Sequence, residues 1–160
     1  SAENYGLELE LRQSIGELLP VLDGSNINTN ITFLNSEIQL ADSSKGIQTS
    51  PQRPMHGQSS YLVNLNLNYK SSKWGTQLDL FYHNFGKRIV EVGSKPLPDI
   101  YELSRPELDL TFSQPLGRKL KIKGGLQNIL DPMIRFRQGG HTTKEYRNGR
   151  SVSFGISYSL

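Results

Sequence analysis

The chain of 160 residues contains no cysteine. Without thiols it can form neither a disulfide framework nor a metal site built on thiolates. Its hydrophobic content is 35%, below the ~45–50% that is usual for globular domains, while glycine is abundant with 15 residues. This is too little apolar material for a thick core covered on two sides, so the composition favours strands that are apolar on one face only. The length fits one ordinary domain.

Long apolar runs are also missing. No stretch of about 18 consecutive apolar residues occurs, which excludes a transmembrane helix. The first residues, SAENYG, lack the basic start and the apolar stretch of a signal peptide. We therefore expect the chain to be cytoplasmic, already processed, or a piece of something longer. The net charge of +3 is mild and no long basic cluster is present, so nucleic acid is not an expected partner.

The dominant pattern in the sequence is the alternation of apolar and polar residues with a period of two. This period is typical of β-strands that have one apolar face. A helical period is suggested only by the connector SIGELLPVL. The last alternating segment runs to the final residue and places Phe154, Ile156, Tyr158 and Leu160 on one face. Seven segments alternate in this way: residues 5–12, 27–33, 61–69, 74–83, 107–113, 120–127 and 151–160.

The connections between these segments differ systematically in length. SSK and QPLG are tight turns, whereas residues 41–58, 86–104 and 131–149 form long connections rich in glycine, proline and charge. In an antiparallel meander, alternate connections lie at opposite ends of the sheet, so one end has short turns and the other has long loops. Transmembrane β-barrels show this asymmetry, and soluble antiparallel barrels and sandwiches seldom do.

Charge and aromatic residues are also distributed unevenly. A lysine or arginine that faces lipid at mid-membrane costs ~2–4 kcal/mol, so a lipid-facing surface should exclude charge. Aromatic residues near the strand ends predict two girdles, with Tyr69, Trp74 and Tyr158 at the inner level and Tyr5, Tyr61 and Tyr82 at the outer level. A soluble sheet would also bury an apolar face, so the polarity of the faces alone does not distinguish a soluble sheet from a lipid-facing one. The difference in loop length between the two ends favours the lipid-facing sheet. The charged residues of the alternating segments all fall on the opposite faces: Glu8, Glu10, Arg12, Asp79, Glu107, Asp109, Lys121 and Lys123.

Several segments resemble the C-terminal part of a TonB-dependent outer-membrane receptor, in the style of Bacteroidota-type bacteria. They are GLELELRQSI, QSSYLVNLNLNY, LQNILDP and GRSVSFGISYSL, together with GKRIVEVG followed by PDIYELSR. The most specific matches are Gly149-Arg150 before the last strand and Asn128-Ile129-Leu130-Asp131 after the preceding one. The similarity covers essentially all of residues 1–160. It implies an all-β fold, an antiparallel transmembrane β-barrel of which about seven strands are present, within a larger barrel of the roughly 22-stranded type.

The resemblance also implies a function. Receptors of this family sit in the outer membrane of Gram-negative bacteria and take up a scarce nutrient, such as a siderophore, cobalamin, a glycan or a peptide, with TonB-derived energy. The expected partners are outer-membrane lipid, the remaining barrel strands and the plug, and TonB through the N-terminal part that this sequence lacks; a surface lipoprotein is a further candidate. In this family the terminal strand carries the signal for barrel assembly, which assigns that role to Phe154, Ile156, Tyr158 and Leu160. Leu160 departs from the usual terminal phenylalanine.

Residues with catalytic or binding chemistry are sparse. His56, His83 and His141 are far apart and show no metal-ligand spacing, and no G-x-S-x-G motif occurs, so we expect neither an enzyme nor a cofactor. The segment 131–149 offers the candidate ligand contacts, because arginine presents a planar fork to carboxylates and phosphates. Contact with lipopolysaccharide phosphates, or ordinary solvated loop charge, is the alternative. The candidates are Arg135, Arg137, Lys144 and Arg147.

Two further expectations concern strand pairing. A turn centred near Leu116 would place Asp109 beside Lys123 and Thr111 beside Lys121, on the same face. Bacterial single-chain barrels have an even number of strands, so seven strands should not close on themselves. Residues preceding Ser1, or another chain, would then supply the missing strands.

Two alternative functions stay open. One is a small soluble or surface-exposed antiparallel β protein, such as a carbohydrate-binding module. The other is a structural or assembly barrel of the outer membrane that transports nothing.

Overall fold

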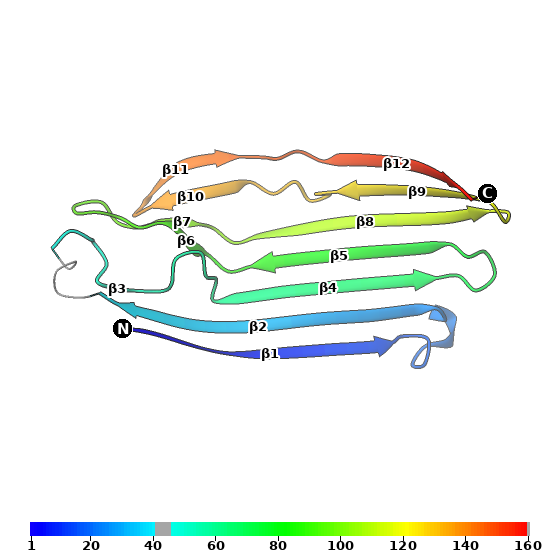
Figure 1. Cartoon of the computed structure of the whole chain (residues 1–160), viewed down its shortest axis with the longest axis horizontal. Helices are drawn as coiled ribbons and strands as arrows, with labels where there is room; N and C mark the ends of the chain where they lie inside the picture. The colour runs from blue at the N-terminus through cyan, green and yellow to red at the C-terminus, as the bar shows by residue number, and fades with distance from the viewer. Residues whose placement is uncertain (41–45, 160) are drawn as a thin grey trace.

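The computed structural model describes residues 1–40 and 46–159. These residues form two antiparallel sheets, and the fold is all-β (Figure 1). The larger sheet is an open meander in which each strand pairs with its neighbours along the chain. In spatial order it contains β1 (Ala2–Ser14), β2 (Ser25–Gln39), β4 (Tyr61–Lys70), β5 (Gln77–Phe85), β8 (Arg105–Leu116), β9 (Leu120–Gln127) and β12 (Ser151–Tyr158), with the short β3 (Gln52–Arg53) paired to β2.

The smaller sheet has four strands in the order β11 (His141–Tyr146), β10 (Ile134–Gln138), β7 (Ile100–Glu102) and β6 (Arg88–Glu91). The connector SIGELLPVL contributes one turn of 3-10 helix, η1 (Pro20–Leu22). Within the described ranges, no helix is long and apolar enough to cross a membrane.

All seven alternating segments of the sequence are strands of the larger sheet, which confirms that part of the prediction. Two boundaries differ: the segment expected to start at Trp74 becomes a strand only at Gln77, and the last strand ends at Tyr158, before Ser159. Gly75 has a φ of 66°, so the backbone still turns there, and Trp74 belongs to the turn. The long connections are predicted as loops, yet they contain β3, β6, β7, β10 and β11.

The strand register aligns the apolar residues into continuous rows across the larger sheet. Leu80 of β5, for example, lies opposite Leu67 on one side and Leu110 on the other. Since side chains alternate along each strand, one face is apolar and the other polar. Glu3 and Glu37, which oppose each other near the end of the sheet that carries the long connections, are the charged residues on the apolar face of the seven described strands. One of the continuous apolar rows across the sheet consists of Ile27, Leu67, Leu80, Leu110, Leu126 and Val152.

The register of the β8–β9 hairpin differs from the prediction. Lys123 lies opposite Ser113 and Lys121 opposite Pro115, so neither lysine is beside Asp109 or Thr111. The strand continues through Pro115, and the turn is formed at Gly117, whose φ is 71°. The shift amounts to two steps of two residues, so Asp109 and Lys123 still share the polar face: the face assignment is confirmed and the register is wrong.

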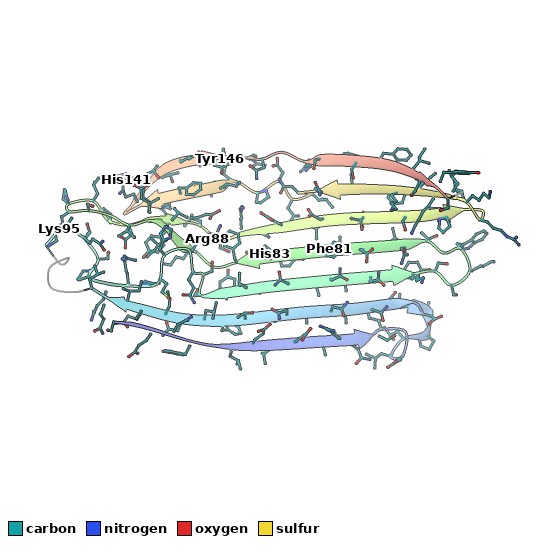
Figure 2. The ribbon with its side chains drawn as sticks, viewed as in Figure 1. Phe81, His83, Arg88, Lys95, His141 and Tyr146 are labelled. Atoms are coloured by element: carbon teal, nitrogen blue, oxygen red, sulfur yellow. The ribbon has the colours of Figure 1, made fainter. Side chains whose placement is uncertain are left out.

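A small buried core lies where the two sheets meet. Phe85 at the end of β5, Ile89 of β6 and Ile134 of β10 are the buried hydrophobic residues of the described chain. Beside them, the buried carboxylate of Glu102 is 2.7 Å from Arg88 and 3.6 Å from Arg105. The guanidinium carbons of both arginines lie over the Phe85 ring, at 4.5 and 5.2 Å from its centroid. Figure 2 shows Arg88 at this junction.

The long connections lie at one end of the larger sheet and the short turns at the other (Figure 1). The smaller sheet, built from residues 86–104 and 131–149, extends from the first end, whereas Tyr158 lies at the short-turn end. This confirms the predicted topology for the described residues. Residues 41–45 and Leu160, which also enter that prediction, lie outside them.

Candidate functional site

The apolar face of the larger sheet is uncovered. Leu9 on β1 is 52% exposed, and Phe154 on β12 is 68% exposed. The buried hydrophobic side chains of the described residues all belong to the junction with the smaller sheet, not to this face. Monomeric soluble proteins rarely expose contiguous apolar patches larger than a few hundred Å². The face is therefore a surface that needs an apolar partner.

Aromatic residues sit at both ends of this face. Tyr69, at the end of β4, and Trp74 lie near the short turns, as does Tyr158. At the other end, the hydroxyl of Tyr61 lies 3.0 Å from Ser104 Oγ, and the hydroxyl of Tyr5 accepts a hydrogen bond from Asn35. Polar tips with apolar rings suit the boundary between an apolar layer and water.

Tyr82 is placed differently from the other predicted girdle residues. It lies opposite Leu65, which is four positions along β4 from Tyr61. Tyr82 is therefore nearer to the middle of the sheet than Tyr61 is.

The strand that the resemblance marks as the assembly signal is an edge strand. Among the described strands, β12 pairs only with β9, so its other side is free. Phe154, Ile156 and Tyr158 all point to the apolar face, in line with Gly124, Ile122 and Leu120 of β9. Leu160 lies outside the described residues.

The polar face carries a set of asparagine pairs that the sequence reasoning missed. Three asparagines of β2 lie directly opposite three of β4: Asn26 with Asn68, Asn28 with Asn66, and Asn30 with Asn64. The signal was present in the sequence as two N-x-N-x-N segments, NINTN and NLNLN. Since both segments alternate, their asparagines must share a face once the strands pair.

These asparagines line a polar trough. Two adjoining depressions of about 540 and 500 Å³ share Arg12, Asn28 and Asn66. The charged side chains around the trough have partners close by. Arg12 lies 2.5 Å from Glu10, and Asp79 accepts a hydrogen bond from Asn68. The trough therefore offers amide donors and acceptors within a nearly neutral surface.

On β5, His83 and Phe81 border the same trough (Figure 2). The His83 Nδ1 is 2.6 Å from Asn64 Oδ1, and Phe81 is 43% exposed. His56, in contrast, lies in a long connection with Nε2 2.9 Å from the Val90 carbonyl. Within the described residues, no three metal-ligating side chains gather in one place.

The four predicted ligand-contact residues lie on one hairpin instead of an irregular loop. Arg135 and Arg137 are on β10, Lys144 is on β11, and Arg147 directly follows β11. The two strands pair along most of their length, with a bulge between Phe136 and Arg137. The structure therefore brings these residues together, as their proximity in sequence suggested.

Each of these cations already has a partner. Arg135 is 3.3 Å from Glu145, Arg147 is 3.6 Å from Asp131, and Arg137 donates to the Gly140 carbonyl at 3.0 Å. The Lys144 ammonium lies 5.7 and 4.9 Å from the centroids of Phe136 and Tyr146, whose rings stack on each other. A ligand that bound here would have to compete with these contacts.

Tyr101, on β7 at the long-connection end, has a perturbed acidity. Burial raises the pKa of its hydroxyl, and the nearby carboxylate of Asp99 raises it further, while Arg53 opposes them. The phenol therefore stays protonated and uncharged at neutral pH.

Comparison with known proteins finds no matching family model, no matching curated protein and no matching solved structure. The geometry of the two faces and the resemblance seen in the sequence are therefore the features that indicate a function.

Proposed function

We propose that this chain forms seven neighbouring strands of a transmembrane β-barrel in the outer membrane of a Gram-negative bacterium. One observation carries the proposal: an apolar face that extends across seven paired strands and is covered by no other part of the described chain. Lipid is the simplest partner for such a surface, since burying one leucine or phenylalanine side chain is worth ~1.5–3 kcal/mol.

The opposite face suits a water-filled interior. It holds the asparagine pairs, the Arg12–Glu10 ion pair and the lysines of β9. Alternation of lipid-facing and lumen-facing residues is the pattern of membrane-spanning β-strands. The loop asymmetry supports the same assignment, with the short turns toward the periplasm and the smaller sheet outside the cell.

The open edges imply further strands. Within the described residues, β1 pairs only with β2, and β12 only with β9. In hydrocarbon, each unpaired backbone group costs several kcal/mol, so both edges need partners. We propose that strands of the same parent protein or of another chain close the barrel.

Within this frame, the resemblance to TonB-dependent receptors supports a role in nutrient uptake. The barrel would enclose a plug, draw energy from TonB and admit a siderophore, cobalamin, glycan or peptide. The outward-facing β10–β11 hairpin would be one of the surfaces that the nutrient, or a surface lipoprotein, meets first. The chain itself would do no covalent chemistry.

Surface labelling in whole cells tests the proposal. Single cysteines would be introduced into the parent protein at Ser94 and Thr143, in the long connections, and at Ser72, in a short turn. We expect a membrane-impermeant thiol reagent to label the first two and not the third. Because the chain has no native cysteine, every signal within it reports the introduced residue.

Three results would contradict the proposal or part of it. Labelling at Ser72 with Ser94 and Thr143 protected would invert the orientation. Recovery of the chain as a monomer in aqueous buffer without detergent would instead support the small soluble module. A barrel in the outer membrane whose parent gene encodes no plug would support a structural or assembly role without transport.

A further inference from the structure

Two of the short turns are strongly basic. The turn between β4 and β5 follows Lys70 and contains Lys73, and the turn between β8 and β9 contains Arg118 and Lys119. All four side chains are exposed. Residues 70–76 and 116–120 include no aspartate or glutamate. The two turns therefore present four positive charges with no acidic residue among them.

Contacts between the strands hold these turns side by side. Gln114 of β8 donates from Nε2 to the carbonyl of Trp74 at 3.1 Å, and its Oε1 accepts from Thr76 Oγ1. Within the first turn, the Trp74 amide donates to Ser71 Oγ at 3.2 Å, and the Gly75 amide donates to the Ser71 carbonyl at 2.9 Å. The cations are thus carried on a fixed scaffold at the end of the sheet.

Aromatic rings accompany the cations. The Lys73 ammonium lies 5.1 Å from the centroid of the Trp74 ring, and the Lys119 ammonium lies 5.9 Å from that of Tyr158. Trp74 is 67% exposed. Tyr158 lies opposite Leu120, on the apolar face. Cationic groups and amphipathic rings therefore meet at the rim where the apolar face ends.

Some cations at the opposite end of the molecule are neutralised by carboxylates, although Arg137 and Lys144 are not. At the opposite end, Arg88, Arg135 and Arg147 each form an ion pair. Within the described part of the chain, Lys73, Arg118 and Lys119 have no such carboxylate partner. The neighbouring turn between β1 and β2 carries Glu17 and Asp23 instead, so the basic surface is confined to the β4–β9 part of the rim.

We propose that the short-turn rim formed by Lys73, Trp74, Arg118, Lys119 and Tyr158 binds the headgroup of an anionic phospholipid. This inference rests on the proposed placement of the apolar face in lipid. The headgroup phosphate would lie among the cations, and the acyl chains would continue along the adjoining apolar side chains. Near a negatively charged membrane surface each lysine or arginine is worth ~1 kcal/mol, which corresponds to a factor of about five in affinity.

The bound partner is a lipid and not a free phosphate, for a structural reason. The cations lie at the edge of the apolar face, where Leu116, Leu120 and Ile156 continue from the rim. A soluble anion would use only the charges, whereas a phospholipid uses the charges and the apolar surface together. A zwitterionic headgroup is less suited, because no acidic residue of these two turns can receive its ammonium group.

The single tryptophan of the chain is the probe for this site. The purified parent protein in neutral detergent micelles, with any tryptophan outside residues 1–160 replaced by phenylalanine, would be titrated with phosphatidylglycerol or phosphatidylcholine, each with brominated or ordinary acyl chains. Quenching by the brominated lipid, taken as a ratio to the ordinary lipid, reports acyl chains next to Trp74. We expect brominated phosphatidylglycerol to quench at a lipid fraction at least about five times lower than brominated phosphatidylcholine. A factor of about five in affinity corresponds to the ~1 kcal/mol that one lysine or arginine contributes near an anionic lipid surface.

Two triple variants separate the site from general electrostatic attraction. Lys73→Gln, Arg118→Gln and Lys119→Gln together should abolish the preference. Lys87→Gln, Arg137→Gln and Lys144→Gln, which remove the same charge at the other end, should leave it intact. Circular dichroism checks that both variants keep their strands. If the first variant does not fold, raising the salt concentration on the unmodified chain serves instead, because screening should reduce the preference.

Each remaining outcome has a distinct meaning. Equal quenching by both lipids would overturn the headgroup proposal while leaving the lipid-facing surface in place. Absence of quenching by either lipid would count against the proposed function itself. Displacement of phosphatidylglycerol by millimolar inorganic phosphate would show that the site binds the phosphate group without the acyl chains. This result would overturn the assignment to a lipid.

Discussion

Gly124 of β9 lies directly opposite Phe112 of β8, and the phenylalanine ring covers the glycine. A Cβ atom at position 124 would stand 2.1 Å from Cε1 of Phe112. Phe112 could not keep its place if residue 124 had a side chain. This contact lies on the apolar face, where an aromatic ring over a glycine keeps the sheet surface continuous.

We therefore predict that Gly124→Ala destabilises the sheet by about 1–3 kcal/mol, the usual cost of overpacking. The midpoint of urea unfolding in detergent, followed by circular dichroism, measures the effect. Gly155→Ala on β12 is the matched control, because a Cβ atom added there would meet no other atom within 4 Å. Equal midpoints for the two variants would show that the Phe112 ring does not depend on Gly124.

The Glu102 carboxylate should be essential to the junction between the sheets. Glu102→Gln would leave Arg88 over the Phe85 ring without a counter-charge, whereas Arg105 would keep Glu107, 3.0 Å away. Breaking a buried pair by removing one partner costs ~3–5 kcal/mol; since Arg88 is partly exposed, we expect the lower part of that range. Hydrogen exchange of the β6 and β7 amides measures it.

Glu145→Gln is the control for this variant. The Arg135–Glu145 pair is half exposed on both sides, and such pairs contribute ~0–1 kcal/mol. Similar amide exchange in both variants would show that Glu102 does not hold the smaller sheet in place.

The two faces of β4 should respond differently to charge. Leu67→Arg places a guanidinium on the apolar face, and Asn66→Arg places the same group on the polar face one residue away. If the apolar face lies in lipid, we expect the first change to cost ~2–4 kcal/mol and the second to be tolerated. The folded fraction of the parent protein in outer membranes, judged by heat-modifiable gel mobility, compares them directly.

The raised pKa of Tyr101 predicts a loss of stability in alkaline solution. A phenol whose pKa is higher in the folded protein than the unfolded value of 10.0 retains its proton better when folded. Its stabilising contribution is complete below pH ~10 and declines as pH rises through the folded pKa. Ultraviolet titration of tyrosinate should show one late-ionising tyrosine that Tyr101→Phe removes. An unchanged titration curve in that variant would reject the assignment.

The larger sheet could be predicted from the sequence because its periodicity is simple. Leu67, Leu80 and Leu110 each sit in a period-two segment, so their strands and faces follow from local alternation. Register does not follow as easily. The β8–β9 turn was placed too early in the chain, because Pro115 and Gly117 together resemble a tight turn although Pro115 still pairs with Lys121.

The smaller sheet could not be predicted by the same means. Its strands are three to six residues long, too short to establish a period. β7 pairs with β6 in the same connection and with β10 in a connection distant along the chain. Glu102 illustrates the difficulty. Its contacts with Arg88 and Arg105 beside the Phe85 ring join residues from different strands, and no local sequence pattern predicts them. The asparagine pairs were predictable in principle, since both N-x-N-x-N segments are visible in the sequence.

The unbroken correspondence between chain order and strand order in the larger sheet has a consequence for biogenesis. Each strand pairs with the strand just before it in the meander, across either a tight turn or one of the long connections. The entropy cost of closing each connection grows only slowly with its length. The sheet can therefore grow one hairpin at a time, and no strand has to be threaded between two already paired. At every stage of this growth the newest strand has one unpaired edge. An assembly machinery could bind this edge until the next strand pairs with it.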